Sequence, residues 1–198
     1  MSAVPLLQPP TGLKRKFRPA LTFEVGEGWA TLGEGADQFE LLPPAQDDSF
    51  TPPKYSSLGV TRVAEVFDPR KQGDTKVSTS RVPDDMISWL QEHPYLKTSE
   101  PEPATVGGRR GTQIDVEVSP VPEDYSQFCE SECLELTISG EGSVFVLPVG
   151  GKSRLIVLKD IEGQTAMISS NAYPASEFDT VTADAQKVID TVEWQSES

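Results

Sequence analysis

The chain has 198 residues, of which 36% are hydrophobic, and this suffices for a domain with a sizeable apolar core. Its 31 acidic and 17 basic residues give a formal net charge of −14 at pH 7, which repels nucleic-acid backbones and anionic membranes. Because of this charge we do not expect nucleic-acid binding. The sequence contains neither a run of about eighteen apolar residues, the length that spans a bilayer, nor the apolar segment of a signal peptide, so we expect no membrane span.

Residues 1–18 are predicted to form an extended or disordered N-terminal arm, and residues 19–195 a single α/β domain. The arm is rich in proline and shows neither a helical nor a strand period. It ends in a basic run, Lys14–Arg18. We interpret this run as a solvated linker, because four charges are few for a membrane or partner tag.

The first half of the domain is predicted to be mainly strands. Residues 21–25 and 59–67 alternate apolar with polar side chains, as half-buried strands do. A short strand is expected at 39–42, before two prolines. The polar stretch 47–57 is predicted to be a loop that moves or acts as a flap.

A helix is predicted to begin at Pro83 and to stop before Pro94. Met86, Trp89, Leu90 and the chain's one histidine, His93, would lie on one face of it. A single histidine cannot build a histidine-based metal site and has no serine or cysteine partner at a recognisable spacing. We therefore expect His93 to be a packed polar residue or a partner of the helix dipole, not a catalytic group.

Residues 105–118 are predicted to form a hairpin that turns at Gly107 and Gly108. The spacing of these glycines with Gly111 is reminiscent of a phosphate-binding loop. The lysine and serine of such a loop are missing, and no helix follows. We therefore assign the glycines to the turn.

Cys129 and Cys133 are the two cysteines of the chain. They can close a small disulfide loop in an oxidising compartment, or remain thiols in a reducing one. A zinc site would need a second pair, and a redox dithiol would need another spacing and a cationic neighbour. We favour the disulfide. A strand is expected after it, at 143–149.

The stretch 155–194 is predicted to form two strands, a helix and a closing strand. The first two strands, 155–158 and 165–170, would form a hairpin. Ser176 is expected to cap the helix. Its apolar face has a spacing of three and four residues and consists of Phe178, Val181, Ala185, Val188, Ile189 and Val192.

Four motifs resemble those of a group of uncharacterised secreted or lipid-anchored bacterial proteins. They are F-x-P-A-L-T-F-x-V-G-x-G-W at 17–29, P-D-D-x-x-x-W-L-x-x-H-P-Y-L at 83–96, T-V-G-G at 105–108 and D-T-V-E-W at 190–194. The order of elements is also similar to the antiparallel α/β/α sandwich of the PsbP-type subunit of photosystem II and of a Ran-binding nuclear transport factor. The resemblance implies a docking scaffold, but no functional residue of those proteins carries over.

The fold class expected is thus α+β, a mainly antiparallel sheet flanked by helices. We expect a monomeric, non-catalytic binding domain outside the cytoplasm that needs no metal or cofactor and binds a protein or small ligand. The rival hypothesis is a hydrolase with paired carboxylates, which must face one cleft. A third, calcium binding by the loop 123–132, lacks the ligand spacing. The carboxylates available to the rival are Asp84, Asp85, Asp115, Glu117, Glu130 and Glu132.

Overall fold

The computed structural model describes residues 17, 20–44, 55–69, 78–122 and 132–195. The fold is α+β: within these residues, a mainly antiparallel sheet is accompanied by two helices, α1 (Met86–Gln91) and α2 (Phe178–Ile189), and by a 3-10 turn, Ala175–Glu177. The strands are β1 (Leu21–Thr22), β2 (Ala30–Glu34), β3 (Gln38–Leu42), β4 (Tyr55–Phe67), β5 (Thr79–Arg81), β6 (Leu96–Thr98), β7 (Glu102–Val106), β8 (Arg109–Val118), β9 (Cys133–Ser139), β10 (Val144–Pro148), β11 (Lys152–Ile161), β12 (Gln164–Tyr173) and β13 (Glu193–Trp194).

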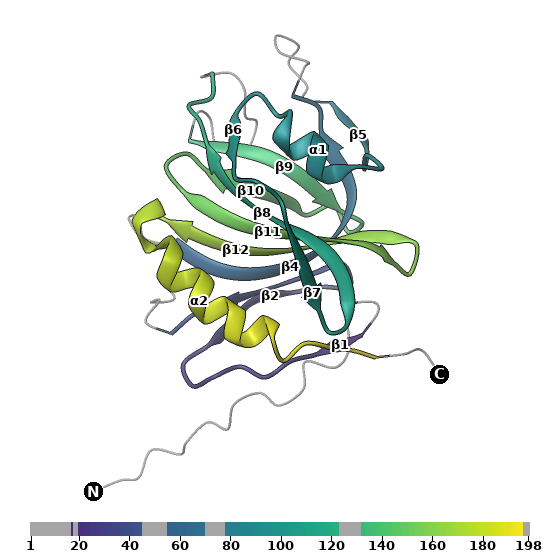
Figure 1. Cartoon of the computed structure of the whole chain (residues 1–198), viewed down its shortest axis with the longest axis vertical. Coiled ribbons are helices and arrows are strands. Elements are labelled where there is room, and N and C mark those ends of the chain that lie inside the picture. The colour runs from purple at the N-terminus through teal and green to yellow at the C-terminus, as the bar shows by residue number, and fades with distance from the viewer. Residues whose placement is uncertain (1–16, 18–19, 45–54, 70–77, 123–131, 196–198) are drawn as a thin grey trace, which may run out of the picture.

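The main path through the large sheet runs β10-β9-β4-β12-β11-β8-β6, and its pairings are antiparallel (Figure 1). The long strand β4 organises it. One edge of β4 pairs with β12, while the other pairs first with β3 and then with β9. Hairpins add β2 to β3 and β7 to β8.

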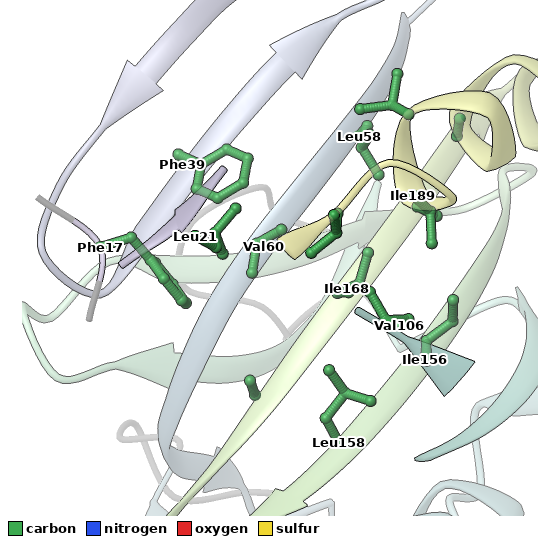
Figure 2. Packing of buried hydrophobic residues seen from close by; sticks show 14 of the residues in the cluster. Phe17, Leu21, Phe39, Leu58, Val60, Val106, Ile156, Leu158, Ile168 and Ile189 are labelled. Atoms are coloured by element: carbon green, nitrogen blue, oxygen red, sulfur yellow. The ribbon is translucent and has the colours of Figure 1, made fainter. Parts of the chain in front are cut away.

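The two faces of the sheet carry separate cores, because successive residues of a strand point to opposite faces. Ile156 and Leu158 of β11 belong to the core that α2 covers, shown in Figure 2. Leu155 and Val157 belong to the core that contains Met86 and Leu90 of α1. We call these the α2-side core and the α1-side core.

The two ends of the described chain meet beside α2. Strand β1 pairs with β13, with Leu21 opposite Trp194. The indole Nε1 of Trp194 donates a hydrogen bond of 2.9 Å to the carbonyl oxygen of Val106, at the end of β7. Three of the four motifs singled out in the sequence therefore lie together in space.

The hairpin turn at Gly107 and Gly108 is confirmed, with φ angles of 54° and 78°. The apolar face of α2 is also confirmed, since Phe178 and Ile189 are buried. In α1, by contrast, Trp89 is only partly buried against the α1-side core. The cap predicted at Ser176 is wrong. This residue lies inside the 3-10 turn, and the cap position of α2, Glu177, makes no side-chain capping bond.

Several strand bounds differ from those predicted. Strand β1 ends at Thr22, three residues early, and Phe23 stacks on Phe39 instead, with ring centroids 5.2 Å apart. Strand β4 begins at Tyr55, inside the predicted loop, and the rest of that loop up to residue 54 lies outside the described residues. Strands β2, β5, β6 and β9 were not predicted. Of the predicted arm, residues 1–18, the structure describes Phe17 alone.

Candidate binding site

A line of polar side chains continues the α1-side core along β4 and β12. Asn171 lies opposite Ser57, and Ser169 lies opposite Gly59, which in turn lies opposite Glu40 of β3. On the other side Ser169 neighbours Leu155, a member of the α1-side core. The face of the sheet thus changes from apolar to polar along its length.

Hydrogen bonds connect these side chains. The Asn171 amide donates to the Oγ atoms of Ser57, at 3.0 Å, and Ser169, at 3.2 Å. The Tyr55 hydroxyl donates to Glu40 Oε1 and also hydrogen-bonds to Ser57. Burial and the neighbouring Glu40 carboxylate raise the pKa of Tyr55, so its phenol remains protonated and a donor. We call Glu40, Tyr55, Ser57, Asn171 and Ser169 the polar row.

The inner end of the polar row leaves one acceptor unused. Asn171 is 6% exposed, and its Oδ1 atom accepts no hydrogen bond from the residues that the structure describes. An unsatisfied buried polar atom costs about 1–3 kcal/mol of folding free energy. Native proteins contain few such atoms, and each calls for an explanation. The polar row is for this reason our candidate site.

Of the predicted carboxylates that the structure describes, Asp115 and Glu117 share one face of the sheet, while Asp84, Asp85 and Glu132 lie elsewhere. Asp84 and Asp85 are exposed at the start of α1, where Asp85 caps the helix through a 3.2 Å bond from the Ser88 amide. This bond lowers the pKa of Asp85.

Asp115 and Glu117 lie on β8, on the face opposite the α1-side core, and Arg154 holds Asp115 with two bonds, at 2.8 and 3.1 Å. Glu132 is exposed just before β9, and Glu130 lies outside the described residues. Among the described side chains no three of the His, Cys, Asp and Glu type are grouped as a metal site requires. Most of the loop once considered for calcium, 123–131, also lies outside them.

Two carboxylates outside the six predicted ones, those of Asp37 and Glu141, lie together where two turns meet. Glu141 Oε2, in the β9–β10 turn, accepts hydrogen bonds from the amides of Ala36, at 2.9 Å, and Asp37, at 3.4 Å. Asp37 forms an ion pair with Arg62, at 3.3 Å. Since Glu141 binds the amides of one turn and Asp37 pairs with Arg62 of β4, both carboxylates are engaged, and we assign this contact to the fold.

His93 is a packed polar residue, as expected. It is 3% exposed and lies edge-to-face with the rings of Trp89 and Tyr95. Its Nδ1 atom accepts a hydrogen bond of 3.3 Å from the Tyr95 amide, which places the proton of the neutral ring on Nε2. Burial lowers the pKa of His93 from 6.5 to about 4.

This shift predicts acid-sensitive stability. Between pH 6.5 and about 4 the unfolded histidine binds a proton that the folded one does not. The contribution of the neutral His93 ring to folding stability is therefore present above pH 6.5 and is lost as the pH falls towards about 4. The loss between pH 7 and pH 5 should be about 2 kcal/mol. Urea unfolding at both pH values measures it. In His93→Phe the difference should shrink by that amount, and an unchanged difference would contradict the assignment.

The disulfide between Cys129 and Cys133 stays a prediction. Cys133 is buried at the start of β9, and Cys129 lies outside the described residues. We expect a disulfide between them, which would contribute about 2 kcal/mol in the chain-entropy model, less than a longer loop would. Counting thiols in denatured, unreduced protein from its native host tests this. Zero free thiols are expected, and two would exclude the bridge.

The comparisons with known proteins do not assign a family. No family model and no curated protein match the chain. Among solved structures, LpqN of Mycobacterium tuberculosis, described as involved in cell envelope biogenesis, is similar at 15% identity and a TM-score of 0.42, over 88% of this chain and 82% of LpqN. A protein from Bacteroides thetaiotaomicron is similar at 15% identity and a TM-score of 0.39, over 89% of this chain.

This chain spans slightly less than half, 46%, of the Bacteroides protein. Both neighbours are bacterial, but likenesses this remote do not transfer a function. The resemblance to PsbP is not confirmed by these comparisons. No helix in the described part of the chain has the length and apolar character needed to cross a membrane.

Proposed function

We propose that the protein is a non-catalytic binding module that works outside the cytoplasm. The observation that supports this most is that three carboxylates of the described chain already have structural partners. The carboxylates of Asp85, Asp115 and Glu141 are already engaged in a helix cap, an ion pair and a turn contact. A general acid or base must instead be within reach of the substrate proton that it transfers.

The polar row is the part of the structure that we propose as the binding site. Its five members are held on adjacent strands of the sheet, and sites on strands are positioned more precisely than sites on loops. The hydroxyl of Tyr55 donates to Glu40, and burial together with this carboxylate raises the pKa of Tyr55, so its phenol stays a protonated hydrogen-bond donor. The extracytoplasmic part of the proposal rests on the expected disulfide, because disulfides persist in oxidising compartments.

The proposal is tested by incubating the protein with a small-molecule extract of the native host and analysing it by mass spectrometry. A binding module should retain a compound and release it on denaturation with its mass unchanged. Loss of a compound with the appearance of its hydrolysis products, abolished in Asp115→Asn or Glu117→Gln, would support the hydrolase hypothesis instead. A boiled sample of the protein is the control.

A further inference from the structure

We propose that the inner end of the polar row binds a neutral hydroxyl group of the kind that sugars and polyols present. This inference rests on the proposed function and names the chemistry of its ligand. Its starting point is the unused Oδ1 acceptor of Asn171, which is buried within a row of hydrogen-bonded side chains.

The donors and acceptors of the row fit a hydroxyl. Both amide hydrogens of Asn171 are used, one for Ser57 and one for Ser169. The carbonyl oxygen Oδ1 therefore needs a donor from elsewhere. The Ser169 hydroxyl accepts from Asn171 and keeps its own hydrogen to donate. A ligand hydroxyl can do both, donating to Asn171 Oδ1 and accepting from Ser169.

The charges of the row favour a neutral ligand. Ser57, Ser169 and Asn171 are uncharged and buried, and burying a charged group without a partner is costly. The one carboxylate, Glu40, lies at the half-buried outer end, already accepts from Tyr55 and repels an anion. A cation would lose its hydration and gain no free carboxylate at Asn171.

Gly59 leaves space for the side chain of Ser169. A Cβ atom at position 59, in the middle of β4, would lie 2.9 Å from Ser169 Oγ, too close for an ordinary contact. Glycine weakens a strand interior and often marks a place where a group approaches the backbone closely. At Gly59 the group that approaches is the Ser169 hydroxyl, which the proposal places against the ligand.

The strand itself offers a matched control. Ser169 and Ser170 are adjacent in β12 and are each 2% exposed, but they point to opposite faces of the sheet. Replacing either with alanine removes one buried hydroxyl. A purely structural role would make the two substitutions similar, whereas ligand binding should depend on Ser169 alone.

The test is an NMR titration of the ¹⁵N-labelled protein with methyl β-D-glucopyranoside, observing the side-chain amide of Asn171. We expect a saturable shift with a Kd of about millimolar order. Ser169→Ala should weaken binding about tenfold, the equivalent of one hydrogen bond, and Ser170→Ala should leave it unchanged. If the Ser169→Ala variant does not fold, Ser57→Ala is used in its place.

Three outcomes would overturn the inference: no saturable shift with the glucoside, a saturable shift with methylammonium chloride instead, or equal weakening by the Ser169 and Ser170 variants. Failure here is separable from failure of the binding-module proposal. Conversion of a host compound contradicts the module. A compound retained unchanged and equally well by the wild type and Ser169→Ala contradicts only the assignment to the polar row.

Discussion

Phe178→Ala is expected to lower the free energy of unfolding by about 3–5 kcal/mol, the usual cost of removing a buried aromatic ring. Phe178 begins α2, is 4% exposed and packs with Ala172 of β12 and Val181. The ammonium of Lys152 lies 4.1 Å from the ring centroid, which adds a cation–π contact. The ring therefore connects the helix to two strands of the sheet.

The midpoint of urea unfolding measures this loss. The matched control is Val146→Ala, because Val146 is 38% exposed and substitutions at exposed sites usually change stability by about 0.5 kcal/mol or less. If the Phe178 variant unfolded at the same urea concentration as the wild type, the assignment of α2 to the sheet would be wrong.

Gly107→Ala is expected to destabilise the protein by about 2–5 kcal/mol, for two reasons. The φ angle of Gly107 is 54°, and the left-handed region costs a residue with a Cβ about 1–2 kcal/mol. In addition, that Cβ would lie 2.6 Å from Trp194 Cδ1 and 2.7 Å from the Val192 carbonyl oxygen. Inserting an atom into a packed site costs about 1–3 kcal/mol more.

Gly108→Ala separates the two effects. Gly108 also has a positive φ, of 78°, but a Cβ there would have no atom within 4 Å. This variant should therefore lose only the backbone share, about 1–2 kcal/mol. Equal losses in the two variants, measured by thermal or urea unfolding, would show that Trp194 does not pack on the turn.

The sequence predicted the elements whose signals are local. The apolar spacing of α2 follows from the helical period, and the hairpin turn follows from two adjacent glycines, which adopt a positive φ without a steric penalty. The capping role of Ser176 was wrong because a 3-10 turn precedes α2 and takes up that position. The periodicity of a helix does not show such a turn.

Strand β9 was missed although Leu134, Leu136 and Ile138 alternate with polar residues. The neighbouring cysteines, with their loop of prolines, suggested a loop there. In a half-solvated strand the polar side chains would face water, but in β9 the polar residues Glu135 and Thr137 are buried. Which positions are buried depends on strands that are distant in the sequence, and a local pattern cannot provide this.

The polar row could not be predicted for the same reason. Its members come from three strands, and Ser57 and Asn171 are 114 residues apart. The available signal was weak: Ser169 and Asn171 are two residues apart in a strand, directly after the apolar run Ala166–Ile168, so they share a face. A polar pair at strand spacing in a buried strand is worth selecting in such a chain.

The central claim, that the polar row binds a neutral ligand, is tested most directly by native mass spectrometry of the folded protein with the small-molecule extract of its host added in excess. The prediction is a mass greater than that of the polypeptide, an excess that disappears on denaturation and is absent from Asn171→Leu, in which an apolar side chain of similar size replaces the amide. The wild type at the bare mass of the polypeptide, or the same excess in both proteins, would contradict it.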